Sequence, residues 1–340
     1  MIPVSVITGF LGSGKTTLLA KLLRDPAMGR TAVIMNELGE IPLDHELIET
    51  SDESFVQLST GCLCCNVRSD LVLTLGDLAA RRAAGTVPPF ERVVVETTGL
   101  ADPAPILHAL MTDRDLCDVY ALEDVITTVD AVTGLATLHA HGESLRQAAL
   151  ADRIVVTKTD VSQSQYAALA QRLGSINPGA QLLSAVRGDI AASALFGPDA
   201  RRATRTAEAQ AWLTHEAEAA KGPDASHRHA RDISSFCIVR DRPVRAVTLA
   251  LFMSALAENC GADLLRMKGI VHVAEHPAAP AVVHGVQHVY HAPDWLPRWP
   301  SEDRRTRLVF IGRVHESWVR ELLELLEEEV TDQMTRPTPD

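Results

Sequence analysis

The chain has 340 residues, of which 46 % are apolar and 22 % are charged, and its net charge is −12. This length predicts two domains of ordinary globular composition, and the negative charge argues against broad affinity for nucleic acid or for an anionic membrane surface. No segment approaches the roughly 18 apolar residues of a membrane span, and the first residues lack a basic, apolar leader, so we expect a cytoplasmic protein with no membrane partner.

Short apolar runs recur through the first half of the sequence, and each is typical of a buried strand. The runs are residues 3–7, 31–35, 54–58, 92–96, 125–129 and 153–157. Helical patterns at 16–25 and 69–85 lie between several of them. Strands that alternate with helices predict an α/β fold over residues 1–200, with a mostly parallel sheet covered on both faces.

Beyond this region the pattern changes. Residues 201–232 are polar and have the Gly, Pro and charge content of a linker. Residues 233–330 then follow the order strand, helix, strand, strand, strand, helix, which predicts a small α+β domain. Residues 331–340 are expected to form a tail.

The segment GFLGSGKT follows the first predicted strand, precedes a predicted helix and matches the phosphate-binding loop pattern of nucleoside triphosphatases. Lys15 is expected to meet the β and γ phosphates, and Thr16 to ligate Mg²⁺. The residues expected to contact the nucleotide here are Gly9, Gly12, Ser13, Gly14, Lys15, Thr16 and Thr17. An ordinary glycine-rich turn is the alternative, but it gives no reason for the lysine and the threonine.

The segment VVTKTD ends the sixth apolar run and resembles the guanine-reading motif N-K-x-D, with Thr157 in place of Asn. Asp160 can accept hydrogen bonds from both N1–H and N2–H₂ of guanine, whereas adenine would leave this carboxylate unpaired. Lys158 is expected to lie along the base, and the shorter Thr157 to support the loop and base less well than Asn. The motif favours GTP and GDP; a polar loop without nucleotide contact is the alternative.

The segment ETTG provides a third part of the predicted site. A strand ends at Glu96, and Gly99 stands in the E-x-x-G arrangement of a γ-phosphate sensor. A glycine amide can approach the phosphate closely, and Glu96 can act on Mg²⁺ through water. The expected catalytic residues are Lys15, Thr16, Glu96 and Gly99. A plain turn at Gly99 is the alternative.

Three polar residues near these motifs have simpler interpretations. Asp102 is expected to cap the helix that starts near Pro103. His108 and Asp130 could approach the site, but a position on a helix surface and a helix cap, respectively, explain them equally well.

The segment GCLCC places Cys62, Cys64 and Cys65 directly after an apolar run, as NELGEIPLDHELI places Glu37. In a parallel sheet both should reach the edge that holds the phosphates. Three thiolates beside a triphosphate would repel it without a cation, and thiolate with carboxylate ligands suits Zn²⁺ or Co²⁺ better than Mg²⁺. We therefore expect these four residues to bind a transition metal, zinc first and cobalt next; thiol redox chemistry and inert packing are the alternatives.

Four other histidines are weaker metal candidates. His227 and His229 lie in the predicted linker, where a solvated segment is the simpler interpretation. His284 and His288 alternate with Tyr290, and one exposed face of a strand explains this pattern more simply than a metal site.

In their order along the chain, these motifs resemble those of the CobW-like P-loop GTPases. That family is related to the nickel-insertion GTPases, and its members are viewed as metallochaperones for zinc or cobalt. The matching segments are GFLGSGKTT, NELGEIPLDHELI, GCLCCNVRSDL, ETTGLADP, TVDA, ADRIVVTKTD, INPGAQ, RMKGIVHV, GVQHVY and LVFIGR. The resemblance covers nearly the whole chain. It implies slow GTP hydrolysis coupled to delivery of a transition metal to a client protein, with a metal-dependent homodimer as a further state.

Two other functions are alternatives. One is a metal-responsive nucleotide-binding regulator whose turnover is incidental, and the other is a P-loop kinase that acts on a small molecule. The kinase is disfavoured by Asp160 and because no Arg-rich lid segment is evident in the sequence. The sequence names neither the metal nor the client.

Overall fold

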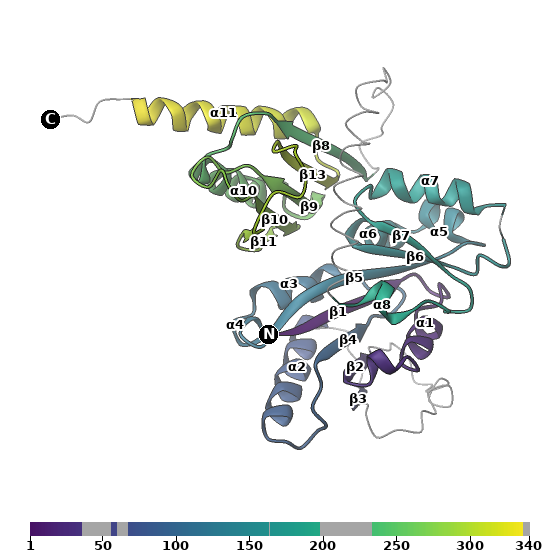
Figure 1. The fold of residues 1–340 in the computed structure, drawn as a ribbon. Coiled ribbons are helices and arrows are strands. Elements are labelled where there is room, and N and C mark those ends of the chain that lie inside the picture. Colours follow the sequence, from purple (N-terminus) through teal and green to yellow (C-terminus); the bar gives the residue numbers. More distant parts are fainter. Residues whose placement is uncertain (36–55, 60–66, 163, 198–232, 336–340) are drawn as a thin grey trace. The chain divides into compact units, whose positions relative to one another are not determined.

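The computed structural model describes residues 1–35, 56–59, 67–162, 164–197 and 233–335 (Figure 1). The chain forms two compact units, Met1–Gln210 and Ala211–Asp340. The linker predicted at 201–232 lies outside the described residues. Among the helices that are described, none combines the length and the hydropathy that a membrane crossing requires.

The first unit is built on a parallel sheet of seven described strands in the order β3-β2-β4-β1-β5-β6-β7 (Figure 1). The strands are β1 (Ile2–Gly9), β2 (Thr31–Met35), β3 (Val56–Ser59), β4 (Arg92–Glu96), β5 (Tyr120–Asp130), β6 (Arg153–Thr157) and β7 (Gln181–Ala185). The predicted α/β fold with a parallel sheet is confirmed. Three apolar runs coincide with β2, β4 and β6, whereas β7 has no counterpart among the predicted runs.

Helices cover both faces of this sheet. They are α1 (Lys15–Leu22), α2 (Val67–Ala83), α3 (Ala104–Thr112), α4 (Arg114–Cys117), α5 (Gly134–Ala140), α6 (Gly142–Leu150), α7 (Tyr166–Ile176) and α8 (Ala192–Leu195). On one face, Ile126 of β5 packs in a buried cluster with Leu18 of α1. The next residue, Thr127, points to the opposite face, where its Oγ1 donates to the main-chain oxygen of Gln147 in α6 at 2.8 Å. Burial on both sides explains why the strands are continuous apolar runs.

One strand of the sheet carries an extra residue. Val4 of β1 pairs with Leu122 and Ser5 pairs with Asp124, so β5 contributes one more residue, Glu123, than β1 over this stretch. The Glu123 carboxylate accepts a hydrogen bond from Ser5 Oγ at 3.2 Å. Such an insertion changes which of the later residues face each layer of the domain.

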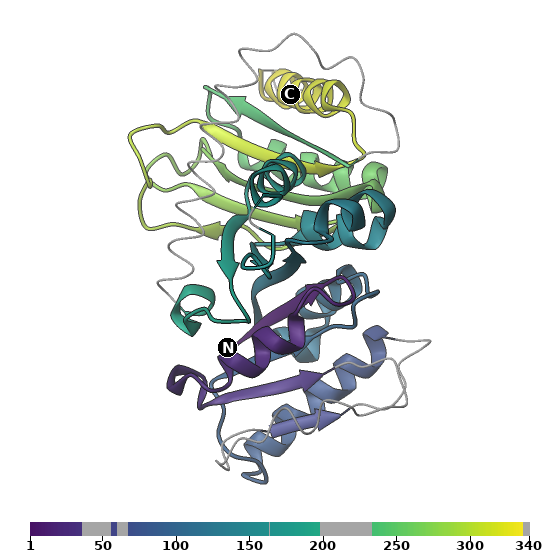
Figure 2. The ribbon, with the colours of Figure 1, turned by 90° about the vertical axis from the view of Figure 1, so that its right-hand side faces the viewer.

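The second unit is an antiparallel sheet with two long helices. Its elements are β8 (Ser234–Arg240), α10 (Ala246–Cys260), β9 (Leu264–Val271), β10 (Ala281–Val286), β11 (Val289–Tyr290), β12 (Asp294–Trp295), β13 (Thr306–Gly312) and α11 (Glu316–Thr335). The strand order is β11-β10-β9-β13-β8, with β12 paired to β10, and Figure 2 shows these strands side by side in green to yellow. The predicted α+β class is confirmed, but the strand predicted in the segment AVVHGVQHVYH is two strands, β10 and β11, and β12 has no counterpart in the prediction. Helix α11 continues through Thr335, into the segment predicted as a tail.

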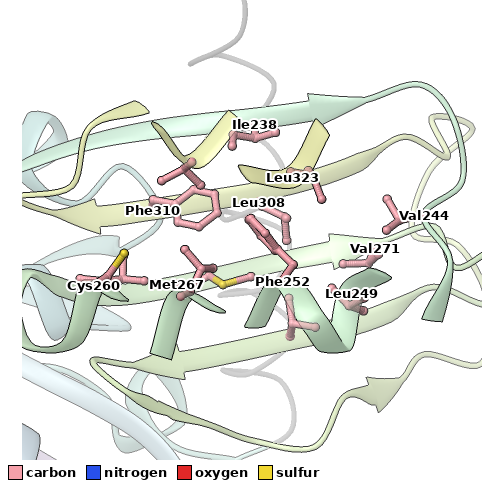
Figure 3. Packing of buried hydrophobic residues seen from close by; sticks show 14 of the residues in the cluster. Ile238, Val244, Leu249, Phe252, Cys260, Met267, Val271, Leu308, Phe310 and Leu323 are labelled. Atoms are coloured by element: carbon pink, nitrogen blue, oxygen red, sulfur yellow. The ribbon is translucent and has the colours of Figure 1, made fainter. Parts of the chain in front are cut away.

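Both helices of the second unit pack on one face of its sheet. Phe252 of α10 and Leu323 of α11 belong to the same buried cluster as Phe310 of β13 (Figure 3). The rings of Phe252 and Phe310 are 6.3 Å apart and nearly perpendicular. All residues of this cluster belong to the second unit, so the unit has a hydrophobic core of its own.

The prediction of one strand face through His284, His288 and Tyr290 is wrong. These residues lie on a hairpin, because β10 contains His284, β11 contains Tyr290, and His288 stands in the turn between them. Gln287 in that turn has a positive φ of 53°. Gly285 pairs with Tyr290, so His284 and Tyr290 lie on opposite faces of the sheet.

Candidate active site

The carboxyl ends of the parallel strands meet at one edge of the first sheet, where open α/β folds bind ligands. The predicted nucleotide motifs follow β1, β4 and β6 at this edge. The register pairs Ile7 with Glu96, Gly9 with Thr128, and Asp130 with Thr157. The sheet thus brings together motifs that are far apart in the sequence.

The phosphate-binding loop connects β1 to α1 through glycines with left-handed backbone angles. Gly12 has φ of 70° and Gly14, which precedes the helix, has φ of 94°. The helix begins at Lys15, so the amides of its first turn have no acceptor within the helix and are available to an anion. Thr17 is exposed in that first turn. This geometry suits a phosphate at the start of α1.

Lys15 is held at the centre of this loop. Its side chain is nearly buried, and Nζ donates to the carbonyl oxygens of Gly9 at 2.9 Å and Phe10 at 3.2 Å. Burial lowers the pKa of Lys15, while the nearby Glu96 carboxylate acts to raise it. The ammonium group is therefore placed where phosphate oxygens can replace the two carbonyls as its acceptors.

Thr16 and Glu96 form a second contact between motifs. Thr16 Oγ1 donates to Glu96 Oε1 at 2.7 Å. A hydroxyl and a carboxylate oxygen at the start of a helix are the hard oxygen ligands that Mg²⁺ prefers. The two residues therefore fit the Mg²⁺ that the sequence motif predicts.

The sensor loop, residues 97–102, rests directly on the phosphate-binding loop. Thr97 Oγ1 donates to Thr8 Oγ1 at 2.9 Å. A Cβ atom added to Gly99 would lie 2.6 Å from the main-chain nitrogen of Leu11. No side chain fits there without moving the backbone, so the glycine at this position is required by the close approach of the two loops.

Near the sensor loop, the structure agrees with the interpretation of Asp102 as a helix cap and disagrees with the interpretation of His108. Asp102 Oδ1 accepts from the Ala104 amide at 3.0 Å, as expected for a cap of α3, and Oδ2 lies 3.2 Å from Nε of Arg146. His108 is buried in α3, with 7 % exposure, so the interpretation as a helix-surface residue is wrong.

Thr157 contacts the phosphate-binding loop despite its short side chain. Its Oγ1 donates to the main-chain oxygen of Ser13 at 2.7 Å. Ser13 Oγ in turn shares a hydrogen bond of 2.6 Å with Thr128 Oγ1. Thr157 thus contacts the phosphate-binding loop, whereas its contact with a base stays a prediction.

Lys158 also reaches the loop. Its Nζ donates to the main-chain oxygen of Gly12 at 2.9 Å and to Asp130 Oδ2 at 2.5 Å. Asp130 Oδ1 accepts from the Val132 amide at 2.7 Å, so this carboxylate both caps a turn and orients the lysine. Asp160 is exposed beyond β6 and is accessible to a base.

Two parts of this arrangement were not anticipated. The first is Thr128. A polar residue within an apolar run is the sequence feature that could have pointed to it. The second is the turn after β7: Ala185 pairs with Thr157, and a Cβ at Gly188 would lie 2.8 Å from the main-chain oxygen of Thr17. This turn therefore packs on the start of α1, beside the guanine motif.

The predicted metal ligands lie outside the described residues: Glu37, Cys62, Cys64 and Cys65. The strands that precede them end at Met35 and Ser59, which pair with each other, and Met35 also pairs with Glu96. His227 and His229 are likewise outside the described residues. Within the described ranges, no group of three or more His, Cys, Asp or Glu side chains is arranged to hold a metal ion.

Comparison with known families gives two matches. Residues 3–184 match the CobW/HypB/UreG nucleotide-binding domain. Residues 233–328 match the cobalamin synthesis protein cobW C-terminal domain. Together the two matches span both units of the structure.

Individual proteins agree with these matches. The chain is 34 % identical to the zinc chaperone YjiA of Escherichia coli over 92 % of this chain and 94 % of that protein. It is 27 % identical to the zinc-regulated GTPase metalloprotein activator 1 of Dictyostelium discoideum over 92 % of this chain and 76 % of that protein. The crystal structure of Zn(II)-bound YjiA GTPase from E. coli superimposes with a TM-score of 0.68 and 28 % identity, covering 96 % of this chain and 98 % of that one.

Proposed function

Since the chain belongs to the CobW/HypB/UreG family of nucleotide-binding proteins, we propose that it is a cytoplasmic, GTP-hydrolysing metallochaperone. In this proposal the GCLCC motif binds a transition metal, zinc first and cobalt next, and the protein passes the metal to a client. The names of the two relatives, a zinc chaperone and a zinc-regulated GTPase, support this assignment.

The nucleotide chemistry follows from the loop contacts. Lys15 and the first amides of α1 would hold the β and γ phosphates, and Thr16 and Glu96 would hold Mg²⁺. Mg²⁺, when bound, neutralises charge that develops on the phosphate oxygens. Gly99 would place its amide near the γ-phosphate, while Asp160 would select guanine.

The observation that carries the metal part of the proposal is the register of the sheet edge. Met35 of β2 pairs with Glu96 of β4 on one side and with Ser59 of β3 on the other, so Glu37 follows the strand beside the residue assigned to Mg²⁺ and the thiols follow the next strand outward. A γ-phosphate that orders these segments would also assemble the metal ligands. We therefore infer that the GTP-bound protein holds the metal and that GDP loosens it, with a coupling of about 1–3 kcal/mol.

Cobalt tests this proposal directly, because thiolate-bound Co²⁺ gives charge-transfer absorption. Its affinity should be measured with a non-hydrolysable GTP analogue, with GDP and without nucleotide. We expect the tightest binding with the analogue and loss of the band in Cys64→Ser or Cys65→Ser, but not in the control Cys117→Ser, whose thiol lies half-buried in α4. Equal Co²⁺ affinity in all three states would contradict transfer driven by GTP.

A further inference from the structure

Gln147 of helix α6 is bound to the sensor loop. Its side chain is fully buried, and Nε2 donates to the carbonyl oxygens of Gly99 at 3.2 Å and Ala101 at 3.0 Å. Its main-chain oxygen accepts from Thr127 Oγ1 of β5. One residue thus links two carbonyls of the loop to the central sheet, and loss of its side-chain donor would leave the buried carbonyl of Gly99 without this partner.

The neighbouring residue makes a second attachment to the same loop. Arg146 Nε lies 3.2 Å from Asp102 Oδ2, at the end of the sensor loop, and Nη2 lies 3.4 Å from Glu143 Oε1. The Arg146 side chain is 29 % exposed and that of Asp102 is 33 % exposed. This ion pair is therefore screened by solvent and should hold the loop less firmly than the buried amide does.

The beginning of α6 touches the other phosphate-facing loop. The ring of His141, directly before the helix, stacks on Phe10 of the phosphate-binding loop with 4.5 Å between ring centroids and 27° between planes. Helix α6 therefore contacts both the phosphate-binding loop and the sensor loop, which also meet each other where Gly99 packs against Leu11.

We propose that α6 braces the sensor loop for recognition of the γ-phosphate, with Gln147 as a positioning residue for GTP hydrolysis and Arg146 as a weaker second support. Two fixed carbonyls restrict the backbone on both sides of Leu100 and hence the position of Gly99. This inference rests on the proposed GTPase function. GDP has no γ-phosphate and would be held mainly by the phosphate-binding loop. The position of the sensor loop should therefore change the affinity for GTP but not the affinity for GDP.

The substitution Gln147→Met removes both hydrogen bonds at nearly constant side-chain volume. We expect kcat for GTP hydrolysis and the affinity for a non-hydrolysable GTP analogue each to fall about tenfold, while GDP affinity changes less than about twofold. The matched control is Gln171→Met on the exposed surface of α7, which should change none of these quantities.

A second pair of variants changes residues that are not buried in the core, so it remains informative even if Gln147→Met destabilises the fold. Arg146→Met should lower the ratio of GTP-analogue to GDP affinity about threefold, whereas Arg172→Met on α7 should not. If Gln147→Met lowers the affinities for the GTP analogue and for GDP equally, the residue has only a structural role and the inference is overturned. An unchanged kcat in this variant would also overturn it. If the wild-type protein itself neither binds nor hydrolyses GTP, the proposed function fails and the inference fails with it.

Discussion

Thr16 and Glu96, 80 positions apart in the sequence, are joined by a hydrogen bond of 2.7 Å between Oγ1 and Oε1. The bond connects the first turn of α1 to the end of β4, the two segments assigned to one cation. Because both side chains start from rigid elements, their oxygens are positioned with little loss of conformational freedom on ion binding.

Glu96→Gln should weaken Mg²⁺ binding and slow hydrolysis, and should change nucleotide affinity less. The amide oxygen can still accept from Thr16, but the negative charge is lost and with it the effect that raises the pKa of Lys15. We expect kcat to fall about tenfold or more, which corresponds to about 1.4 kcal/mol, and a higher Mg²⁺ concentration for half-maximal hydrolysis. A Mg²⁺ titration of GTP hydrolysis measures both, with the exposed Glu91→Gln as the control. An unchanged Mg²⁺ dependence would contradict the assignment.

In the proposed function, nucleotide choice depends on Asp160. We expect GTP to bind at least about tenfold more tightly than ATP, or about 1.4 kcal/mol, because adenine leaves this carboxylate unpaired. Asp160→Ala should remove most of the difference, whereas Asp118→Ala, at an exposed position beyond α4, should preserve it. Calorimetric titrations with both nucleotides decide the matter, and equal affinities in the wild type would refute the guanine assignment.

Lys15→Ala should abolish hydrolysis and leave the fold intact, since the side chain belongs to the loop and not to a hydrophobic cluster. Its ammonium donates to Gly9 and Phe10, so we expect the melting temperature to change by no more than a few degrees. Lys21→Ala, on the exposed side of the same helix, should keep wild-type turnover. Hydrolysis at the wild-type rate in Lys15→Ala would show that the loop does not act on the phosphates.

The stability of the first unit should fall as the pH rises towards neutral. Burial and the Asp152 carboxylate raise the pKa of Asp124 to about 7, against the opposing effect of Arg153, whose Nη1 lies 2.9 Å from Asp124 Oδ2. The folded protein therefore retains a proton that the unfolded chain loses above about pH 4. This contribution is complete below pH 4 and is lost between about pH 4 and 7.

Urea unfolding at pH 5 and at pH 8 measures this effect. We expect a lower free energy of unfolding at pH 8, and a smaller difference between the two conditions in Asp124→Asn, which cannot titrate. The exposed Asp118→Asn is the control. A difference between pH 5 and 8 that is equal in the wild type and Asp124→Asn would place the titrating group elsewhere.

The strands and loops of the first unit could largely be predicted because parallel strands buried on both faces are continuous apolar runs. β7 could not be predicted in this way, because it is an edge strand in which Gln181 and the two leucines that follow it are only half-buried. The hairpin at His284 and Tyr290 could not be predicted for another reason. The turn between β10 and β11 is two residues long, so alternation continues through it and imitates a single strand.

For the site, sequence motifs identify side chains but not their contacts with one another. The bond from Thr157 to Ser13 and the ion pair of Lys158 with Asp130 depend on which strands are neighbours. Gln147 carries no motif at all. Its contacts with the sensor loop depend on the packing of α6 against the loop that follows β4, which no sequence pattern predicts.

The extra residue in β5 sets the phase of that strand. Beyond Glu123, Thr128 meets Ser13 of the phosphate-binding loop and Thr127 meets Gln147 on the opposite face. Deleting Glu123 would make the pairs Val4–Leu122 and Ser5–Asp124 consecutive, so every later side chain of β5 would keep its face and both loops their contacts. One further residue inserted between Glu123 and Thr127 has no such regular register to return to. It would turn Thr127 and Thr128 to opposite faces and exchange their environments, so we expect an insertion in this strand to be far more damaging than the loss of Glu123.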